Sequence, residues 1–285
     1  MIAWIVLPPQ YPFMLLEARK RPALEHLYAR YGRRLLRRSF ARVWVGGESW
    51  PDGDGPSIGF LNHSAWWDPI LTLFLSHDLF RRDGYGIMQG AQLQRYPFFR
   101  RIGCFGATGD SFEDARTVSL YAGRVLHEGA RRTLWIFPQG ELLPARVPLA
   151  FRSGAARFAR TAPEAPLVPV AVRYEFRAEQ RPEAFVRVGE AVRADSARSG
   201  GAGDAGSSTR DGVLRLTRRL EQRLRQELAT LDDDLARATR PATSALPAHS
   251  LSDAGYRVVL EGASSLSSLY DRTLGRLPTL RRRRA

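Results

Sequence analysis

Residues 57–69 read SIGFLNHSAWWDP and join a short apolar run to a polar turn. The apolar residues 58–61 predict a short buried strand. Proline is favoured in the first turn of a helix, so Asp68-Pro69 predicts that a helix over residues 69–79 follows the turn. The stretch therefore reads as a strand that leads through a tight turn into a helix.

The same alternation continues along the chain. Further strands are expected at residues 85–89, 104–107, 133–137, 167–174 and 184–188, and a helix is expected at residues 111–128. Strands that alternate with helices predict an α/β fold with a central mixed sheet flanked by helices.

Composition divides the chain into five segments. Residues 1–45 are predicted to be an apolar and amphipathic segment that faces a membrane, and residues 46–193 form the main domain. Residues 194–211 are rich in glycine and serine and predict a flexible linker. Leucines at four- and three-residue steps predict an amphipathic helix over residues 212–240, a C-terminal helical extension that docks on the domain. Residues 241–285 are predicted to be a basic tail.

The N-terminal segment leaves two alternatives open. Residues 1–16 (MIAWIVLPPQYPFMLL) are apolar, are interrupted by prolines, and are followed by Arg19, Lys20 and Arg21. They either lie in a membrane interface, with the cations at the headgroups, or pack on the core. Residues 22–42 place apolar side chains at helical spacing among arginines and predict an N-terminal amphipathic helix.

The chain is strongly basic, with a formal net charge of +14. This charge favours an anionic partner, and with the apolar N-terminus it predicts peripheral binding to the cytoplasmic face of the cell membrane. Nucleic acid is disfavoured because the cations are spread out and no aromatic-plus-basic motif occurs. No run reaches the roughly 18 apolar residues that span a bilayer. The single cysteine, Cys104, excludes an intramolecular disulfide and fits a reducing compartment.

His63 and Asp68 lie five residues apart between the first predicted strand and its helix. A histidine accepts protons near neutral pH, and it works best when a carboxylate fixes its tautomer and supports the imidazolium. The turn can bring Asp68 to one ring nitrogen and leave the other nitrogen facing outward. Such a pair is the base and its orienting group from a catalytic triad, with a substrate hydroxyl as the nucleophile. The alternative from this pattern alone is a structural histidine–aspartate pair.

A second polar loop, Phe137-Pro138-Gln139-Gly140-Glu141, follows another predicted strand and should open at the same edge of the sheet as His63. Asn62-His63 with Asp68, then this loop, then the strand Val168-Pro169-Val170, resemble the glycerolipid acyltransferase family, the lysophosphatidate acyltransferase-like enzymes. The resemblance covers residues 57–175.

The resemblance implies direct transfer of a fatty acyl group to a hydroxyl of a lipid-like acceptor. His63 would be the general base, Asp68 would orient it, and the donor would be acyl-CoA or acyl-carrier protein. No cofactor beyond this co-substrate is implied, and the histidines show no metal-ligand spacing. Substrate-binding roles would fall to Gln139, Gly140 and Glu141.

The chain departs from the family pattern in two places. The family loop commonly reads Phe-Pro-Glu-Gly-Thr-Arg, whereas here Gln139 replaces the glutamate and the threonine and arginine are missing. Gly109 stands where the family has an arginine thought to grip the acceptor's phosphate. We therefore expect either an acceptor other than ordinary lysophosphatidate, or a phosphate held by Arg101 or Arg152 instead.

Two further questions stay open at the level of sequence. Trp66 and Trp67 either fill the core or line a groove for the acyl chain. The departures from the family pattern also allow a different class of protein, a catalytically decayed lipid- or membrane-binding protein on the same scaffold.

Overall fold

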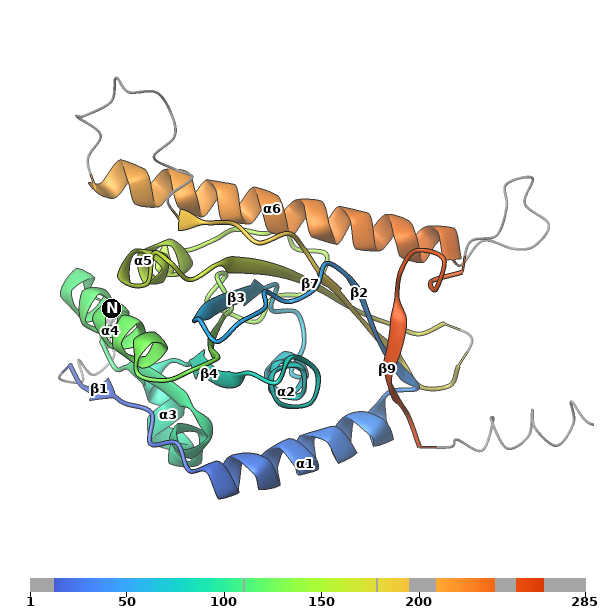
Figure 1. Cartoon of the computed structure of the whole chain (residues 1–285), viewed down its shortest axis with the longest axis horizontal. Coiled ribbons are helices and arrows are strands. Elements are labelled where there is room, and N and C mark those ends of the chain that lie inside the picture. The colour runs from blue at the N-terminus through green and yellow to red at the C-terminus, as the bar shows by residue number, and fades with distance from the viewer. Residues whose placement is uncertain (1–12, 110, 178, 195–208, 239–249, 264–285) are drawn as a thin grey trace, which may run out of the picture.

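The structure is a computed structural model, which describes residues 13–109, 111–177, 179–194, 209–238 and 250–263 (Figure 1). In this part of the chain, nine strands form one sheet in the order β1-β5-β4-β6-β3-β7-β8-β2-β9. The strands are β1 (Leu15–Leu16), β2 (Arg42–Gly47), β3 (Ser57–Leu61), β4 (Asp83–Ile87), β5 (Cys104–Ala107), β6 (Arg132–Ile136), β7 (Leu167–Glu175), β8 (Glu183–Val188) and β9 (Arg257–Glu261).

The centre of the sheet is parallel and its edges are mixed. Strands β3 to β7 run parallel to one another, β8 runs antiparallel to β7, and β2 runs parallel to β8. The outer strands β1 and β9 pair antiparallel with β5 and β2. The predicted α/β fold with a mixed sheet is therefore confirmed. Because β3 and β6 are parallel neighbours, the loops that follow them open at the same edge of the sheet.

Helices cover both faces of the sheet (Figure 1). One face packs against α4 (Phe112–His127), α5 (Gly154–Thr161) and the long α6 (Thr209–Ala238), and the other against α1 (Pro22–Ser39) and α2 (Asp68–Phe74). A π-helical segment η1 (Leu75–Phe80) continues α2, and a short α3 (Gly90–Arg95) and a 3₁₀ helix η2 (Pro97–Ile102) lie between β4 and β5.

The six predicted strands are present as β3 to β8, with β4 beginning two residues earlier than expected. The leucine stripe of α6 is buried against the sheet, at Leu220, Leu224, Leu228, Leu231 and Leu235. Burial of all five leucines explains why this polar sequence holds a helix of 30 residues.

Two segments differ from the prediction. β2 was not predicted, and it crosses the expected domain boundary at residues 45–46. Residues 257–261, assigned to a basic tail, form β9 and pair with β2. β9 carries charged residues at both ends and buries only Leu260, so its sequence lacks the alternation that marks a strand. Residues 264–285 of the expected tail and most of the expected linker lie outside the described residues.

The N-terminal region is described from residue 13. Leu15–Leu16 pair with β5, and Leu16 is buried, so this end of the apolar segment packs on the sheet. Residues 1–12 lie outside the described part. In α1, Ala29, Gly32 and Leu36 form the buried side, whereas Leu27 is 65% exposed. Among the described residues, no helix is long and apolar enough to cross a bilayer.

Candidate active site

The site begins at the carboxyl end of β3, the central strand between β6 and β7. Every residue of β3 is buried. The next residue, Asn62, uses its side-chain amide to bond both backbone groups of Val172 on β7, donating at 3.0 Å and accepting at 2.9 Å. These two bonds fix the backbone at the point from which His63 projects.

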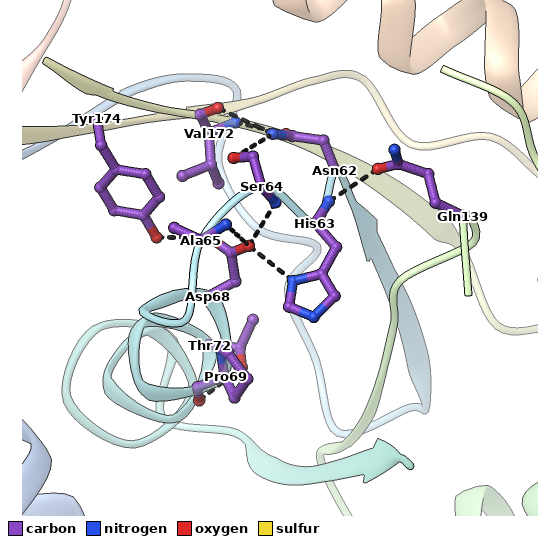
Figure 2. Close-up of polar contacts among 10 residues, drawn as sticks. All are labelled: Asn62, His63, Ser64, Ala65, Asp68, Pro69, Thr72, Gln139, Val172 and Tyr174. Carbon is purple, nitrogen blue, oxygen red and sulfur yellow. Dashed lines mark hydrogen bonds and ion pairs between the residues drawn. The ribbon is translucent and has the colours of Figure 1, made fainter. Parts of the chain in front are cut away.

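Asp68 is the first residue of α2 and is fully buried. One carboxylate oxygen, Oδ2, lies 2.8 Å from His63 Nδ1 and accepts the backbone N–H groups of Ser64 at 2.8 Å and Ala65 at 2.9 Å (Figure 2). The turn between β3 and α2 thus closes around this carboxylate.

The pairing defines the tautomer of His63. An ionised carboxylate only accepts hydrogen bonds, so Nδ1 carries the proton and Nε2 keeps a free lone pair. The ring stacks on Phe137, with the ring centroids 4.2 Å apart and 24° between the planes. The His63 side chain is 18% exposed. This geometry suits a general base whose Nε2 faces a substrate.

Tyr174 is a further member of the site that the sequence motifs did not indicate. Its hydroxyl donates to Asp68 Oδ1 at 2.6 Å, so both carboxylate oxygens are bonded. Burial, and then the neighbouring Asp68 charge, hold the pKa of Tyr174 well above its ordinary value. Tyr174 therefore stays protonated and acts as a donor. It lies near the end of β7, 106 residues from Asp68, so only the pairing of β3 with β7 could have revealed it.

The loop after β6 closes over the opposite side of His63. Gln139 is buried, and its side-chain oxygen accepts the backbone N–H of His63 at 2.9 Å. The backbone carbonyl of His63 accepts the N–H of Leu143 at 3.0 Å. Gln139 thereby holds the backbone of the histidine, a contact that its expected substrate-binding role did not include.

Gly140 turns the loop with φ of 77°, a left-handed conformation that favours glycine. A Cβ at this position would come within 2.9 Å of the Arg152 side chain. Arg152 and Glu141 are both more than half exposed and form an ion pair at 3.8 Å. The backbone N–H of Arg152 also donates to Pro138 at 2.8 Å, which fastens the loop.

Comparison of the sequence with family models identifies the family of this chain. The model of the family described as Acyltransferase matches residues 31–173, half of the chain. The chain belongs to this family. It is therefore an acyltransferase.

Among solved structures, the acyltransferase is similar to the 1-acyl-sn-glycerophosphate (LPA) acyltransferase PlsC from Thermotoga maritima. The two share 19% sequence identity with a TM-score of 0.49, over 73% of this chain and 80% of that chain. No curated protein matches the sequence.

The acyltransferase has two cavities at His63, which contributes to the walls of both. The larger has a volume of about 1000 Å³ and lies over the ends of β4, β5 and β6. Its walls are largely aromatic and aliphatic, and they include Tyr85, Phe99, Val118, Trp135 and Phe158. Gly140, Glu141 and Arg152 line the same cavity.

The two tryptophans of the first motif, which could either fill the core or line an acyl-chain groove, occupy different environments. Trp66 lines the large cavity and is 65% exposed. Trp67 instead packs edge-on against Phe40, with ring centroids 5.1 Å apart, and is not among the residues that line the cavity. Trp66 alone therefore remains a candidate to line the groove for the acyl chain.

The two arginines that were expected to hold a phosphate, Arg101 and Arg152, also lie in different places. Arg152 contacts the loop after β6, but Arg101 is at the exposed end of η2 and lines neither cavity. Gly109 lines the large cavity, and a Cβ there would lie 2.1 Å from the carboxylate of Asp114. A larger residue at this position therefore requires the Asp114 side chain to move away.

The smaller cavity, of about 270 Å³, lies between residues 143–149, β7 and α6. Asn62, His63, Ser64 and Gln139 form its inner wall. No group of three or more histidine, cysteine, aspartate or glutamate side chains within the described ranges is arranged to hold a metal ion.

Proposed function

We propose that this acyltransferase moves a fatty acyl group from the thioester of acyl-CoA or acyl-carrier protein to a hydroxyl of a lipid-like acceptor. His63 is the general base, and Asp68 orients it. The observation that carries the proposal is the buried Asp68 bonded to Nδ1 of a histidine that lines an apolar cavity of about 1000 Å³.

In the proposed reaction, Nε2 of His63 takes the proton of the acceptor hydroxyl as its oxygen attacks the thioester carbonyl carbon. The carbon–sulfur bond then breaks, and the proton passes from His63 to the leaving sulfur, which departs as a thiol. The Asp68 carboxylate stabilises the imidazolium between these two steps. General-base catalysis of this kind contributes about 100-fold to 10,000-fold in rate.

The large cavity is the proposed site of the acyl chain. Its volume is at the upper end of the roughly 300–1000 Å³ that ligand sites occupy, and apolar walls suit a hydrocarbon chain. Trp66 and the stacked pair His63 and Phe137 bring aromatic surface to the end of the cavity where the thioester would react.

The proposal includes peripheral attachment to an anionic membrane surface. Tyr28 of α1 and Phe98 of η2 contact each other, with ring centroids 5.0 Å apart, and both line the large cavity. Leu27 and Tyr31 of α1 are exposed nearby, among exposed arginines at residues 30, 34 and 38. Exposed apolar side chains flanked by cations are typical of surfaces that lie in a membrane interface.

The test is an assay of thiol release from a long-chain acyl-CoA, with and without lipid alcohols, followed by mass spectrometry of the lipid product. We expect thiol release that depends on the acceptor and an equal amount of new ester. Binding to liposomes without thioester consumption, across acyl-CoA and acyl-carrier protein donors, would favour the decayed lipid-binding protein instead.

A further inference from the structure

The small cavity lies on the other side of the loop after β6 from the large cavity, and the charge of its walls is different. The loop separates the two cavities, because Gln139 lines the small one, Gly140 to Leu142 line the large one, and Leu143 to Leu149 line the small one again. The small cavity therefore reaches the site of acyl transfer from a second direction.

Three arginines line this cavity, each from a different element: Arg146 from the loop, Arg173 from β7 and Arg225 from α6. Asp232 of α6 is the single acidic side chain among the lining residues. The cavity walls are therefore cationic, whereas the large cavity is mostly apolar.

Two of the guanidinium groups are held in place and keep unused donors. Arg173 donates from Nε and Nη2 to the carboxylate of Asp232 at 2.7 and 2.8 Å. Arg225 donates from Nη2 to the carbonyl of Leu149 at 2.5 Å and to Glu221 at 2.6 Å. A guanidinium has five N–H donors, so both groups can also bind an anion.

Arg146 differs from the other two. Its side chain is exposed and has no hydrogen-bond or ion-pair partner among the described residues. Arg146 lines the same cavity of about 270 Å³ as the two positioned guanidinium groups. Three arginines around one cavity suit an anion with several acceptor oxygens.

We propose that the small cavity is a phosphate-binding subsite, which holds the phosphate-bearing end of a substrate whose reactive end meets His63. This inference rests on the proposed function. One wall of the small cavity is formed by α6, which lies outside the residues 31–173 matched by the family model. The subsite would replace the arginine that is missing where Gly109 stands.

Either substrate can supply the phosphate. The donor carries phosphates at the far end of its pantetheine arm, and a phospholipid acceptor carries one on its headgroup. The shared chemistry is a phosphate oxygen bonded to arginine, and paired substrates that differ only in phosphate separate the two sources.

The experiment measures KM and kcat for two matched pairs of substrates, acyl-phosphopantetheine against acyl-pantetheine and lysophosphatidate against monoacylglycerol. The variants are Arg146→Ala and Arg225→Ala. Arg218→Ala is the control, because it removes the same charge from an exposed position on α6 that lines neither cavity. Arg146→Ala also guards against a folding defect, since Arg225 has bonds that secure the loop.

We expect each cavity variant to raise KM about 10-fold for the phosphate-bearing member of one pair and to leave its phosphate-free partner unchanged. The affected pair identifies the source of the phosphate. An equal effect on both members of each pair, or no effect beyond that of Arg218→Ala, would overturn the subsite.

A binding measurement tests the phosphate-binding subsite independently of acyl transfer. Isothermal titration of the full chain with coenzyme A, with pantetheine and with a short-chain lysophosphatidate needs no turnover. We expect a phosphate-bearing probe to bind the unsubstituted protein and to bind Arg146→Ala about 10-fold more weakly. Failure of every phosphate probe to bind would overturn the subsite, whereas binding without any acyl transfer would count against the proposed function alone.

Discussion

Asp68 is the residue on which the candidate site depends most. Four groups converge on its buried carboxylate: the imidazole of His63, two backbone N–H groups and the hydroxyl of Tyr174. Donors that are already in place stabilise the carboxylate without reorganisation during the reaction. Asp68 therefore both shapes the turn that follows β3 and sets the tautomer of His63.

The first prediction concerns Asp68→Asn, which keeps the size of the side chain and removes its charge. An amide cannot support the imidazolium, so kcat should fall about 100-fold or more while KM for the donor changes little. Steady-state kinetics check this, with Asp78→Asn as the control, because Asp78 lies beside His77 outside both cavities. A kcat for Asp68→Asn close to that of the control would contradict the orienting role.

The second prediction concerns Tyr174→Phe, which removes only the hydroxyl that donates to Asp68. A buried carboxylate oxygen that loses its donor should lower the free energy of unfolding by about 1–3 kcal/mol. The raised pKa of Tyr174 keeps its hydroxyl protonated throughout the neutral range, so this loss should not vary between pH 6 and 9 in urea denaturation. The half-exposed Tyr31 provides the control, Tyr31→Phe, which should be neutral.

At this scale the sequence located His63 and Asp68 because they are close along the chain and lie between a strand and a helix. It did not locate Tyr174, and it did not predict the contact between Gln139 and the backbone of His63. Both depend on which strands pair with β3 and in what register, and that information is not local in sequence. Arg101, one of the two arginines expected to hold a phosphate, lies at the exposed end of η2 and lines neither cavity.

At the scale of elements, the loop after β6 is held by backbone geometry as much as by side chains. Gly140 has a left-handed conformation, and its N–H donates to the carbonyl of Phe137 at 2.9 Å. This turn aligns Gln139 with the backbone of His63 on one side and Glu141 with Arg152 on the other. The loop therefore holds the backbone of His63 in place.

The third prediction compares two glycine substitutions. Gly140→Ala introduces a Cβ at a positive φ and against the Arg152 side chain, so it should cost about 1 kcal/mol or more of unfolding free energy and reduce kcat. Gly212→Ala in α6 is the matched control, because no atom lies within 4 Å of the added Cβ and helix propensity favours alanine. Thermal unfolding and kinetics check both. Equal effects of the two substitutions would contradict the account of the loop.

The elements that the sequence predicted well are those with a strong local pattern. β3, β6 and β7 are continuous apolar runs, as expected for parallel strands with both faces covered, and α6 has a regular leucine stripe. β9 is a short edge strand with one buried residue, and β1 has two residues. Their positions follow from pairing with β2 and β5, so local patterns could not predict them.

At the scale of the whole molecule, α1 carries exposed arginines and exposed apolar side chains and also contributes to the wall of the large cavity. Tyr28 lines this cavity, and Leu27 and Tyr31 are exposed beside it. A lipid substrate would then enter from the membrane without crossing water. Each cation near an anionic bilayer contributes about 1 kcal/mol, so a few arginines and an apolar contact suffice for reversible binding.

The fourth prediction is that the protein floats with anionic liposomes at low salt and less so as salt rises, because salt screens exposed charges. Replacing Leu27 and Tyr31 together by glutamine should reduce flotation. Leu214→Gln is the control, because Leu214 is an exposed leucine on α6, which covers the other face of the sheet. Flotation that is equal in both variants would contradict a binding surface on α1.

The central claim is that His63 is the base for acyl transfer, and one measurement tests it directly: kcat/KM of His63→Ala beside that of His127→Ala. His127 is the matched control because it also pairs with a carboxylate, Glu164 at 2.9 Å, but lines neither cavity. We expect His63→Ala to lose about 100-fold to 10,000-fold in kcat/KM with its circular dichroism spectrum unchanged, and His127→Ala to stay near the unsubstituted rate. A folded His63→Ala that transfers acyl groups within about threefold of that rate would contradict the account.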